Sequence, residues 1–207
     1  MHYETLTNTA KQILPHFKKK LNSYYLAGGT AIAIQIGHRI SVDFDFFTSE
    51  KISKTLFPEI KKLLPENTNI NVSVNNSDEL TIFINDLKIT FLFYQFPLIK
   101  PLIDIEGIKV CNIQELAAMK AYTIGRRADF KDYIDIYYLL LEKHSSLSEI
   151  IELAKKKYAN DFNDRLFLEQ LIYSDDIDTT NITLLKQGDL TKECLKNFFK
   201  EEIRKIL

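Results

Sequence analysis

The chain has 207 residues, 45% of them hydrophobic, and a formal net charge of -1. That length allows one large domain or two small ones, and the balanced charge excludes a global basic field for nucleic acid, although not a local patch. Two cysteines without metal-ligand spacing argue against zinc, and the absence of a signal peptide or of a ~20-residue apolar run predicts a cytoplasmic protein with no membrane partner.

The first part of the chain is organised around YYLAGGTAIAIQIGHRISVDFDFF, residues 24–47. Hydrophobic spacing and the turn residues define its elements and the helix before it. In chain order we expect a helix over 3–21, a strand over 24–27, a Gly-Gly turn at 28–29, a helix over 30–36 capped by the Thr30 hydroxyl, and a strand over 40–47.

The rest of the chain changes from alternating to helical patterns. We expect a helix over 53–64, an antiparallel meander of strands over 69–74, 80–85 and 88–94, and an irregular crossing between Pro97 and Pro101. Helices then follow over 112–126, 129–141, 146–158, 161–173 and 191–207, with an acidic loop over 174–180. The pattern predicts an α+β protein: a mixed sheet flanked by helices in residues 1–105, then a helical bundle in residues 106–207.

Two aspartates, Asp43 and Asp45, lie one residue apart on the strand expected over 40–47. Successive side chains of a strand point to opposite faces, so both carboxylates share one face. Val42, Phe44 and Phe46 share the other face and are expected to be buried. Because neighbouring carboxylates repel unless a cation lies between them, we interpret the pair as a Mg²⁺ site.

The Gly28-Gly29 turn before a helix leaves backbone N–H groups at the positive end of the helix dipole. Such a turn alone is more often only a tight turn. Together with two carboxylates on the next strand, it suits nucleotidyl transfer, in which a metal neutralises the triphosphate.

Two segments resemble the nucleotidyltransferase superfamily, and specifically the AbiEii/AbiGii-type toxin family. The first, AGGTAIAIQIGHRISVDFDFF, is similar to its Gly-Gly-Thr/Ser, His-Arg-x-Ser and Asp-x-Asp pattern. The second, LAAMKAYTIGRRADFKDYIDIYYLL, is similar to its later motif with a lysine, arginines and Asp-x-x-Asp. The resemblance covers residues 24–141. It implies the toxin half of a toxin–antitoxin pair in phage defence, with an NTP substrate, a cognate antitoxin, and tRNA as the acceptor of some relatives.

The resemblance also implies roles for single residues, including a second half of the active site in residues 106–207. Asp43 and Asp45 would bind Mg²⁺, and Lys120 would approach the triphosphate. Asp132 or Asp135 would act as a base or as an added metal ligand. The residues that would hold the nucleotide are Gly28, Gly29 and Thr30. From their positions and charge, Arg39 and Arg126 are further candidates to bind the nucleotide phosphates.

Several of these residues also fit structural roles. Asp132 is the third residue of a helix capped by Asp129, a favourable place for any acid. Lys131 could pair with Asp135, and Arg126 could meet the end of its own helix. However, Asp132 and Asp135 share a helix face with apolar residues, and carboxylates inside an apolar stripe must be paired.

Superfamily members often have a third carboxylate on a later strand, yet the strand expected over 88–94 contains no acid. Three functions follow from the sequence. The first is a Mg²⁺-dependent enzyme that transfers NMP from an NTP to an acceptor hydroxyl. The second is a nucleotide- or partner-binding module that has lost the chemistry, and the third is a transferase acting on a small molecule or a protein.

Overall fold

The computed structural model describes residues 1–18, 21–124, 126–127, 129–173, 177, 182–186 and 190–206. The chain divides into two compact units. The first consists of Met1–Pro97 and Pro101–Cys111, and the second of Leu98–Lys100 and Asn112–Leu207. The division therefore lies after Cys111 rather than after residue 105, because a hairpin in residues 103–110 belongs to the sheet.

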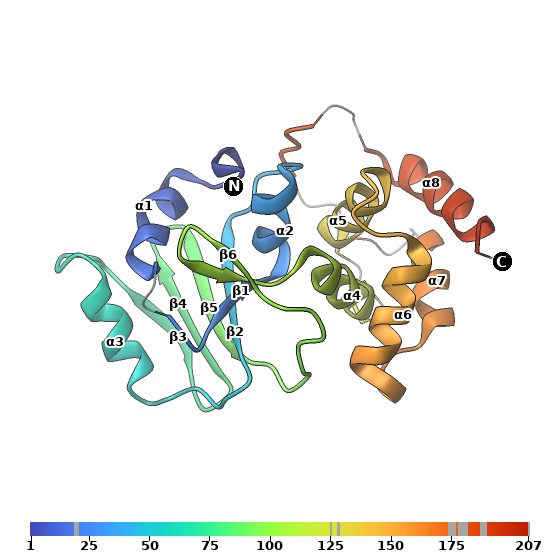
Figure 1. Ribbon diagram of the computed structural model, residues 1–207. Coiled ribbons are helices and arrows are strands. Elements are labelled where there is room, and N and C mark those ends of the chain that lie inside the picture. The colour runs from blue at the N-terminus through green and yellow to red at the C-terminus, as the bar shows by residue number, and fades with distance from the viewer. Residues whose placement is uncertain are drawn as a thin grey trace. The chain divides into compact units, whose positions relative to one another are not determined.

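The first unit is a mixed sheet of seven strands in the order β3-β4-β5-β2-β1-β7-β6 (Figure 1). The expected meander is confirmed, since β3, β4 and β5 pair antiparallel. Its last strand joins the rest of the sheet by pairing parallel with β2, which pairs antiparallel with β1. The strands are β1 (Tyr25–Ala27), β2 (Asp43–Thr48), β3 (Asn71–Asn75), β4 (Glu79–Ile84), β5 (Leu87–Phe93), β6 (Ile103–Ile105) and β7 (Ile108–Val110).

The β6–β7 hairpin was not predicted from the sequence. Each strand has three residues, too few for an alternating pattern to stand out. The turn between them contains Glu106 and Gly107, both with positive φ, at 53° and 86°. Two successive residues of this kind form the turn that best matches the twist of paired strands. Val110 then lies beside Leu26, which adds the hairpin to the sheet through β1.

Helix α1 (Asn8–Phe17) covers one face of the sheet through an aromatic cluster. Phe17 makes edge contacts with Phe46 at 5.7 Å and with Phe91 at 6.4 Å, and the latter two rings stack at 5.2 Å. The helix starts later than predicted because the Thr7 side chain caps it. The other helices of this unit are α2 (Gly28–Ile36) and α3 (Leu56–Leu63).

The second unit is helical, as predicted (Figure 1). Two expected caps are confirmed, Asp129 on α5 and the Ser146–Glu149 capping box on α6. Aromatic contacts join α5 to α8, with Tyr137 and Phe198 at 4.6 Å. The helices are α4 (Ile113–Ile124), α5 (Phe130–Leu141), α6 (Leu147–Tyr158), α7 (Asp164–Ile172) and α8 (Lys192–Arg204).

Two of the expected helix boundaries in this unit are wrong. α4 ends at Ile124, before Arg126. α7 begins at Asp164 because Asn163 caps it, and residues 159–161 form a separate 3-10 turn. The loop expected over 174–180 lies outside the described residues, except for Ile177, as does the expected end of the last helix at Leu207.

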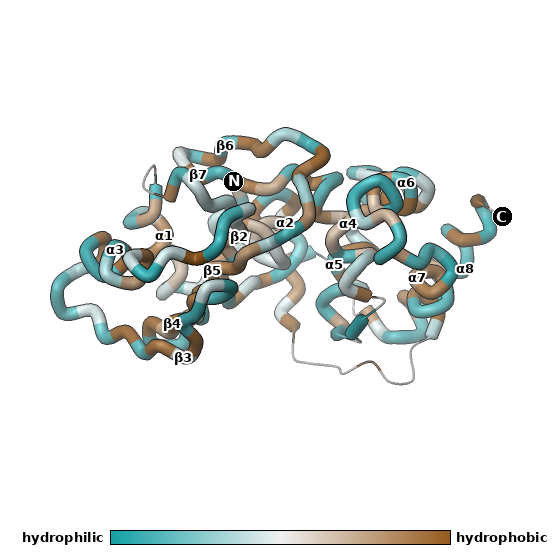
Figure 2. Tube along the Cα trace, turned by 90° about the horizontal axis from the view of Figure 1, so that it is seen from below, coloured by the Kyte–Doolittle hydropathy of each residue, from teal (hydrophilic) through white to brown (hydrophobic). Residues whose placement is uncertain are grey.

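Helix α6 is amphipathic, and Figure 2 shows hydrophilic stretches of its tube interrupted by hydrophobic ones. Its apolar positions, such as Leu147 and Ile150, are buried, and most of its charged positions are exposed. Across the described part of the chain, no helix combines the length and the apolar character required to cross a membrane.

Candidate active site

The acidic pair lies on β2 as the alternation predicted. Asp43 and Asp45 are partly exposed on one face, whereas Phe44 and Phe46 are buried on the other. The prediction that Val42 is also buried was wrong, because it precedes the strand and is 50% exposed. The two carboxylates therefore project from the same side of a strand whose opposite side is fixed in the core.

The neighbouring strand β5 shows what replaces a third carboxylate. In the parallel register of β2 and β5, Lys88 lies beside Asp43 and Thr90 beside Asp45. Direct partners in a sheet share a face, so a cation and a hydroxyl lie next to the acidic pair. Among the described residues no group of three His, Cys, Asp or Glu side chains is arranged to hold a metal ion.

Gly28 brings the start of α2 against the acidic strand. Its φ is 66°, in the left-handed region that side-chain-bearing residues rarely adopt. A methyl group built at this position would overlap the Asp45 carboxylate. The glycine pattern and the acidic pair are thus one constellation, because the missing side chain is what lets the carboxylate approach the start of the helix.

We expect Gly28→Ala to destabilise the protein by about 2 kcal/mol or more, since it combines backbone strain with overlap on Asp45. It should also abolish the nucleotidyl transfer that the resemblance implies, by displacing that carboxylate. Urea denaturation and a transfer assay measure the two effects. Gly107→Ala is the matched control, because Gly107 has a φ of 86° in the β6–β7 turn. The control should lose stability but retain transfer; equal losses of transfer would contradict this role of Gly28.

Thr30 does not cap α2, contrary to the prediction. The helix already begins at Gly28, so Thr30 lies inside its first turn, where it is 2% exposed. Its hydroxyl donates to the carbonyl oxygen of Asp43 and lies 2.6 Å from the hydroxyl of Ser41. These contacts tie the helix to the start of β2. Ser41 is the serine of the His-Arg-x-Ser motif, but the sequence did not indicate that it contacts Thr30.

Arg39 and His38 are both buried, at 3% and 0% exposure. The Arg39 guanidinium donates to the Ile40 carbonyl oxygen at 3.1 Å, next to the segment that leads into β2. Arginine cannot be deprotonated in a protein, so the residue places a permanent positive charge inside this unit.

Lys120 lies between two carboxylates in the second unit. Its ammonium nitrogen is 2.6 Å from Asp132 Oδ1 and 2.6 Å from Asp135 Oδ2. Both aspartates are 0% exposed, and the lysine side chain is 8% exposed. The expectation that carboxylates in this apolar stripe must be paired is confirmed. The alternative pairing of Lys131 with Asp135 is wrong, because Lys131 lies 3.5 Å from Asp129 instead.

Arg127 completes this cluster. Its Nε and Nη2 donate to the two oxygens of Asp132 at 2.8 and 3.1 Å. Burial raises the pKa of Asp132, but the charge of Lys120 and the contacts of Arg127 outweigh burial and hold the pKa below the ordinary 3.8. Asp132 is therefore ionised at neutral pH and is engaged by cations on both oxygens. This arrangement suits a carboxylate that positions Lys120 more than one that accepts a proton.

Arg126, a candidate for binding the nucleotide phosphates, is held by contacts within its own unit. Its guanidinium lies 3.5 Å from the centre of the Tyr122 ring, which stacks in turn on Tyr158 at 3.9 Å. Its nitrogens donate to the carbonyl oxygens of Tyr122 at 3.1 Å and of Asp161 at 2.8 Å.

A second buried ion pair, which the sequence reasoning missed, joins Glu115 of α4 to Lys157 of α6. The two charged atoms are 2.6 Å apart and both side chains are 0% exposed. Glu115 also accepts hydrogen bonds from the backbone N–H groups of Ile99 and Lys100. One feature of the sequence could have drawn attention to Glu115: it is the third residue of a helix that Asn112 caps, a position at which an acidic side chain is favourable.

The whole chain, including the mixed sheet with two carboxylates on one strand and a glycine-led helix beside it, has the same fold as solved nucleotidyltransferases. MenT4, a nucleotidyltransferase toxin from Mycobacterium tuberculosis, superposes with a TM-score of 0.65 at 16% identity over 95% of this chain and 84% of that chain. JHP933 from Helicobacter pylori gives 0.54 at 16% identity over 97% and 96%. The antibiotic-resistance factor ANT(2″)-Ia gives 0.52 at 12% identity over 70% and 87%.

The family model of the nucleotidyl transferase AbiEii toxin of type IV toxin–antitoxin systems matches residues 12–207. The chain belongs to this family and is a nucleotidyltransferase. An uncharacterized protein from Aquifex aeolicus is 31% identical over 189 residues, which cover 90% of this chain and 89% of the relative.

Proposed function

We propose that this protein is a Mg²⁺-dependent toxin that transfers NMP from an NTP to an acceptor hydroxyl, with tRNA as the acceptor, an antitoxin protein as its partner, and phage defence as its role. The observation that carries the proposal is the Asp43–Asp45 pair held against Gly28 at the start of α2. Carboxylates fixed beside a helix N-terminus suit a metal-bound triphosphate.

The donor set fits Mg²⁺. This ion prefers hard oxygen ligands and is commonly bound through one or two protein carboxylates together with substrate phosphates. Asp43 and Asp45 would hold it, and when bound it would neutralise charge on the triphosphate and activate the acceptor oxygen. The backbone of Gly28 and Gly29 would orient the phosphates, while the Thr30 contact with Asp43 keeps the strand in place.

For Lys120 we propose contact with the triphosphate or with the pyrophosphate that leaves. Asp132 and Asp135 would fix the ammonium in place, with Arg127 holding Asp132. A lysine whose position is set by two buried carboxylates loses little conformational freedom when it meets an anion, but the same carboxylates offset its charge. A role for Asp132 or Asp135 as base or metal ligand would first require Lys120 to move away.

Incubation of the purified protein with labelled NTPs, Mg²⁺ and total tRNA tests the function. Label should transfer to the RNA with release of pyrophosphate. The absence of transfer to any acceptor, together with the absence of a thermal shift with any NTP, would contradict the proposal.

The second candidate function is a nucleotide- or partner-binding module that lacks catalytic activity. The basic Lys88 beside Asp43 favours it. Such a module would show the thermal shift without transfer.

We expect Lys88→Asp to tighten divalent-metal binding about tenfold, because it changes the charge beside Asp43 by two units. Mn²⁺ binding followed by electron paramagnetic resonance measures this effect without requiring turnover. Lys54→Asp is the control for overall charge, since Lys54 is exposed and precedes α3. Equal metal affinity in the Lys88 variant and the native protein would show that Lys88 does not act on the acidic pair.

A further inference from the structure

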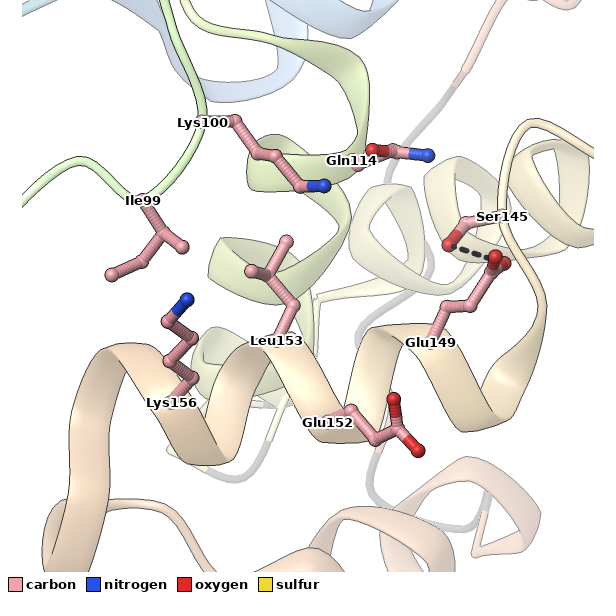
Figure 3. Close-up of a pocket in the computed structure, with 8 residues that line it drawn as sticks. All are labelled: Ile99, Lys100, Gln114, Ser145, Glu149, Glu152, Leu153 and Lys156. Atoms are coloured by element: carbon pink, nitrogen blue, oxygen red, sulfur yellow. Dashed lines mark hydrogen bonds between the residues drawn. The ribbon is translucent and has the colours of Figure 1, made fainter.

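The second unit contains a pocket of about 310 Å³ that none of the proposed catalytic residues lines. We call it the α6 pocket (Figure 3). One wall is a face of α6, the opposite wall is formed by Ile99 and Lys100, and Ser145 lies at one end. Its volume is at the lower end of the range for small-ligand sites. The lining residues are Ile99, Lys100, Gln114, Ser145, Glu149, Glu152, Leu153 and Lys156.

The wall opposite α6 is fixed from behind by the buried Glu115–Lys157 pair. Glu115 accepts the N–H of Lys100 at 2.8 Å and that of Ile99 at 3.1 Å. Hydrogen bonds to a charged, buried acceptor are among the stronger ones in proteins. Burial of an ion pair is costly by itself, yet here it holds an otherwise irregular segment in one position. The pocket therefore exists before any ligand arrives.

Two lysines point into the α6 pocket from opposite walls. In Figure 3 the amino group of Lys100 lies above Leu153, and that of Lys156 lies beside Leu153 and points toward Ile99. Within the described part of the chain neither forms an ion pair, whereas their neighbours Lys155 and Lys157 pair with Asp164 and Glu115. Two like charges facing a common space attract an anion into it.

Two carboxylates, Glu149 and Glu152, also line the pocket, and in Figure 3 they lie on the side away from Lys156. Glu149 accepts hydrogen bonds from the backbone and hydroxyl of Ser146, and these bonds hold its pKa below the ordinary value, with Lys100 contributing less. The Glu152 carboxylate points away from Lys156 in Figure 3. Leu153 and Ile99 add apolar surface beside the lysines. A ligand with a phosphate next to a flat organic group matches this combination.

We propose that the α6 pocket binds the phosphate group of a nucleotide unit, either in a polynucleotide acceptor or in a free nucleotide. This inference rests on the proposed nucleotidyl transfer, whose acceptor it would help to hold. It requires no metal and no chemistry in the second unit.

The test measures binding without NTP, so no transfer occurs. The probes are a fluorescent single-stranded RNA, AMP and inorganic phosphate, and the variant is Lys100→Ala combined with Lys156→Ala. We expect RNA affinity to fall on the order of tenfold, and the slope of log affinity against log salt to decrease by about 0.7 for the one phosphate no longer neutralised. If AMP or phosphate loses affinity in the same variant while RNA does not, the pocket binds the free ligand.

Lys155→Ala is the matched control, since it removes an exposed lysine from the same turn of α6 outside the pocket. Unchanged affinity of the double variant for all three probes, or an equal loss in the control, would overturn the proposal. Transfer assays separate the two hypotheses. If the native protein transfers label and the double variant binds the probes normally, only the proposed phosphate binding in the pocket is refuted. If binding depends on the two lysines but the native protein transfers no label, only the proposed nucleotidyl transfer is refuted.

Discussion

Replacing Asp45 with Asn is expected to lower nucleotidyl transfer by about a hundredfold or more, a typical cost of removing an electrostatic group from an active site. Asn keeps the shape of the side chain against Gly28 but loses the charge that would hold Mg²⁺. Stability should change by no more than about 1 kcal/mol, because the substitution also removes the repulsion between Asp45 and Asp43. Transfer of labelled NMP and growth arrest on expression measure the loss of function.

Asp86→Asn is the matched control for this variant. Asp86 lies in the turn between β4 and β5 and is exposed. Its carboxylate accepts a hydrogen bond from the Thr9 hydroxyl at 2.8 Å. It should retain full transfer. Mn²⁺ titration of both variants shows whether the lost activity follows lost metal binding. If the Asp45 variant transfers label at the native rate, the acidic pair is not the catalytic metal site.

Replacing Lys120 with Met is expected to destabilise the protein by about 3 to 5 kcal/mol, because it leaves two fully buried carboxylates without their shared cation. Arg127 still contacts Asp132, but Asp135 loses the Lys120 partner. Urea denaturation measures the change. Lys131→Met is the control: Lys131 forms a partly exposed pair with Asp129 at 3.5 Å, and such pairs contribute about 1 kcal/mol at most.

The pH dependence of the Lys120 variant follows from the sign of the Asp132 shift. In the native protein this pKa is depressed below 3.8, so the stabilisation is present above that pH and is lost as pH falls through the folded-state value. Without Lys120 less positive charge offsets the effect of burial, so the pKa of Asp132 should rise. Protonation of Asp132 would then remove an unfavourable buried charge from the variant. The difference in the free energy of unfolding between the variant and the native protein should therefore shrink as the pH falls from about 7 to about 4.

A rescue experiment separates stability from catalysis in this cluster. Combining Lys120→Met with Asp135→Asn removes the uncompensated charge, so part of the lost stability should return. Transfer should stay low in both variants if Lys120 contacts the triphosphate. Recovery of transfer together with stability would show that the lysine has only a structural role.

Local sequence patterns determined most of the elements of this protein. Alternation placed Asp43 and Asp45 on one face of β2, and helical spacing placed Asp132 and Asp135 in one buried stripe. Caps such as the Ser146–Glu149 box were also readable. These features depend on residues at most a few positions apart, so their geometry follows from the periods of the strand and the helix. The family motifs, too, lie in continuous segments.

Only the tertiary structure decided which side chains meet across the chain. The partners of Lys120 on α5, the register that sets Lys88 beside Asp43, and the pairing of Glu115 with Lys157 all join separate elements. The short β6–β7 hairpin likewise owes its place to β1. Such pairings depend on how separate elements pack and on the register of the strands, and the periodicity of a single helix or strand does not predict them. A charged side chain can be buried only where the fold places a partner beside it. The sequence therefore determined the acidic pair, and the fold decided that Gly28 and Lys88 are its neighbours.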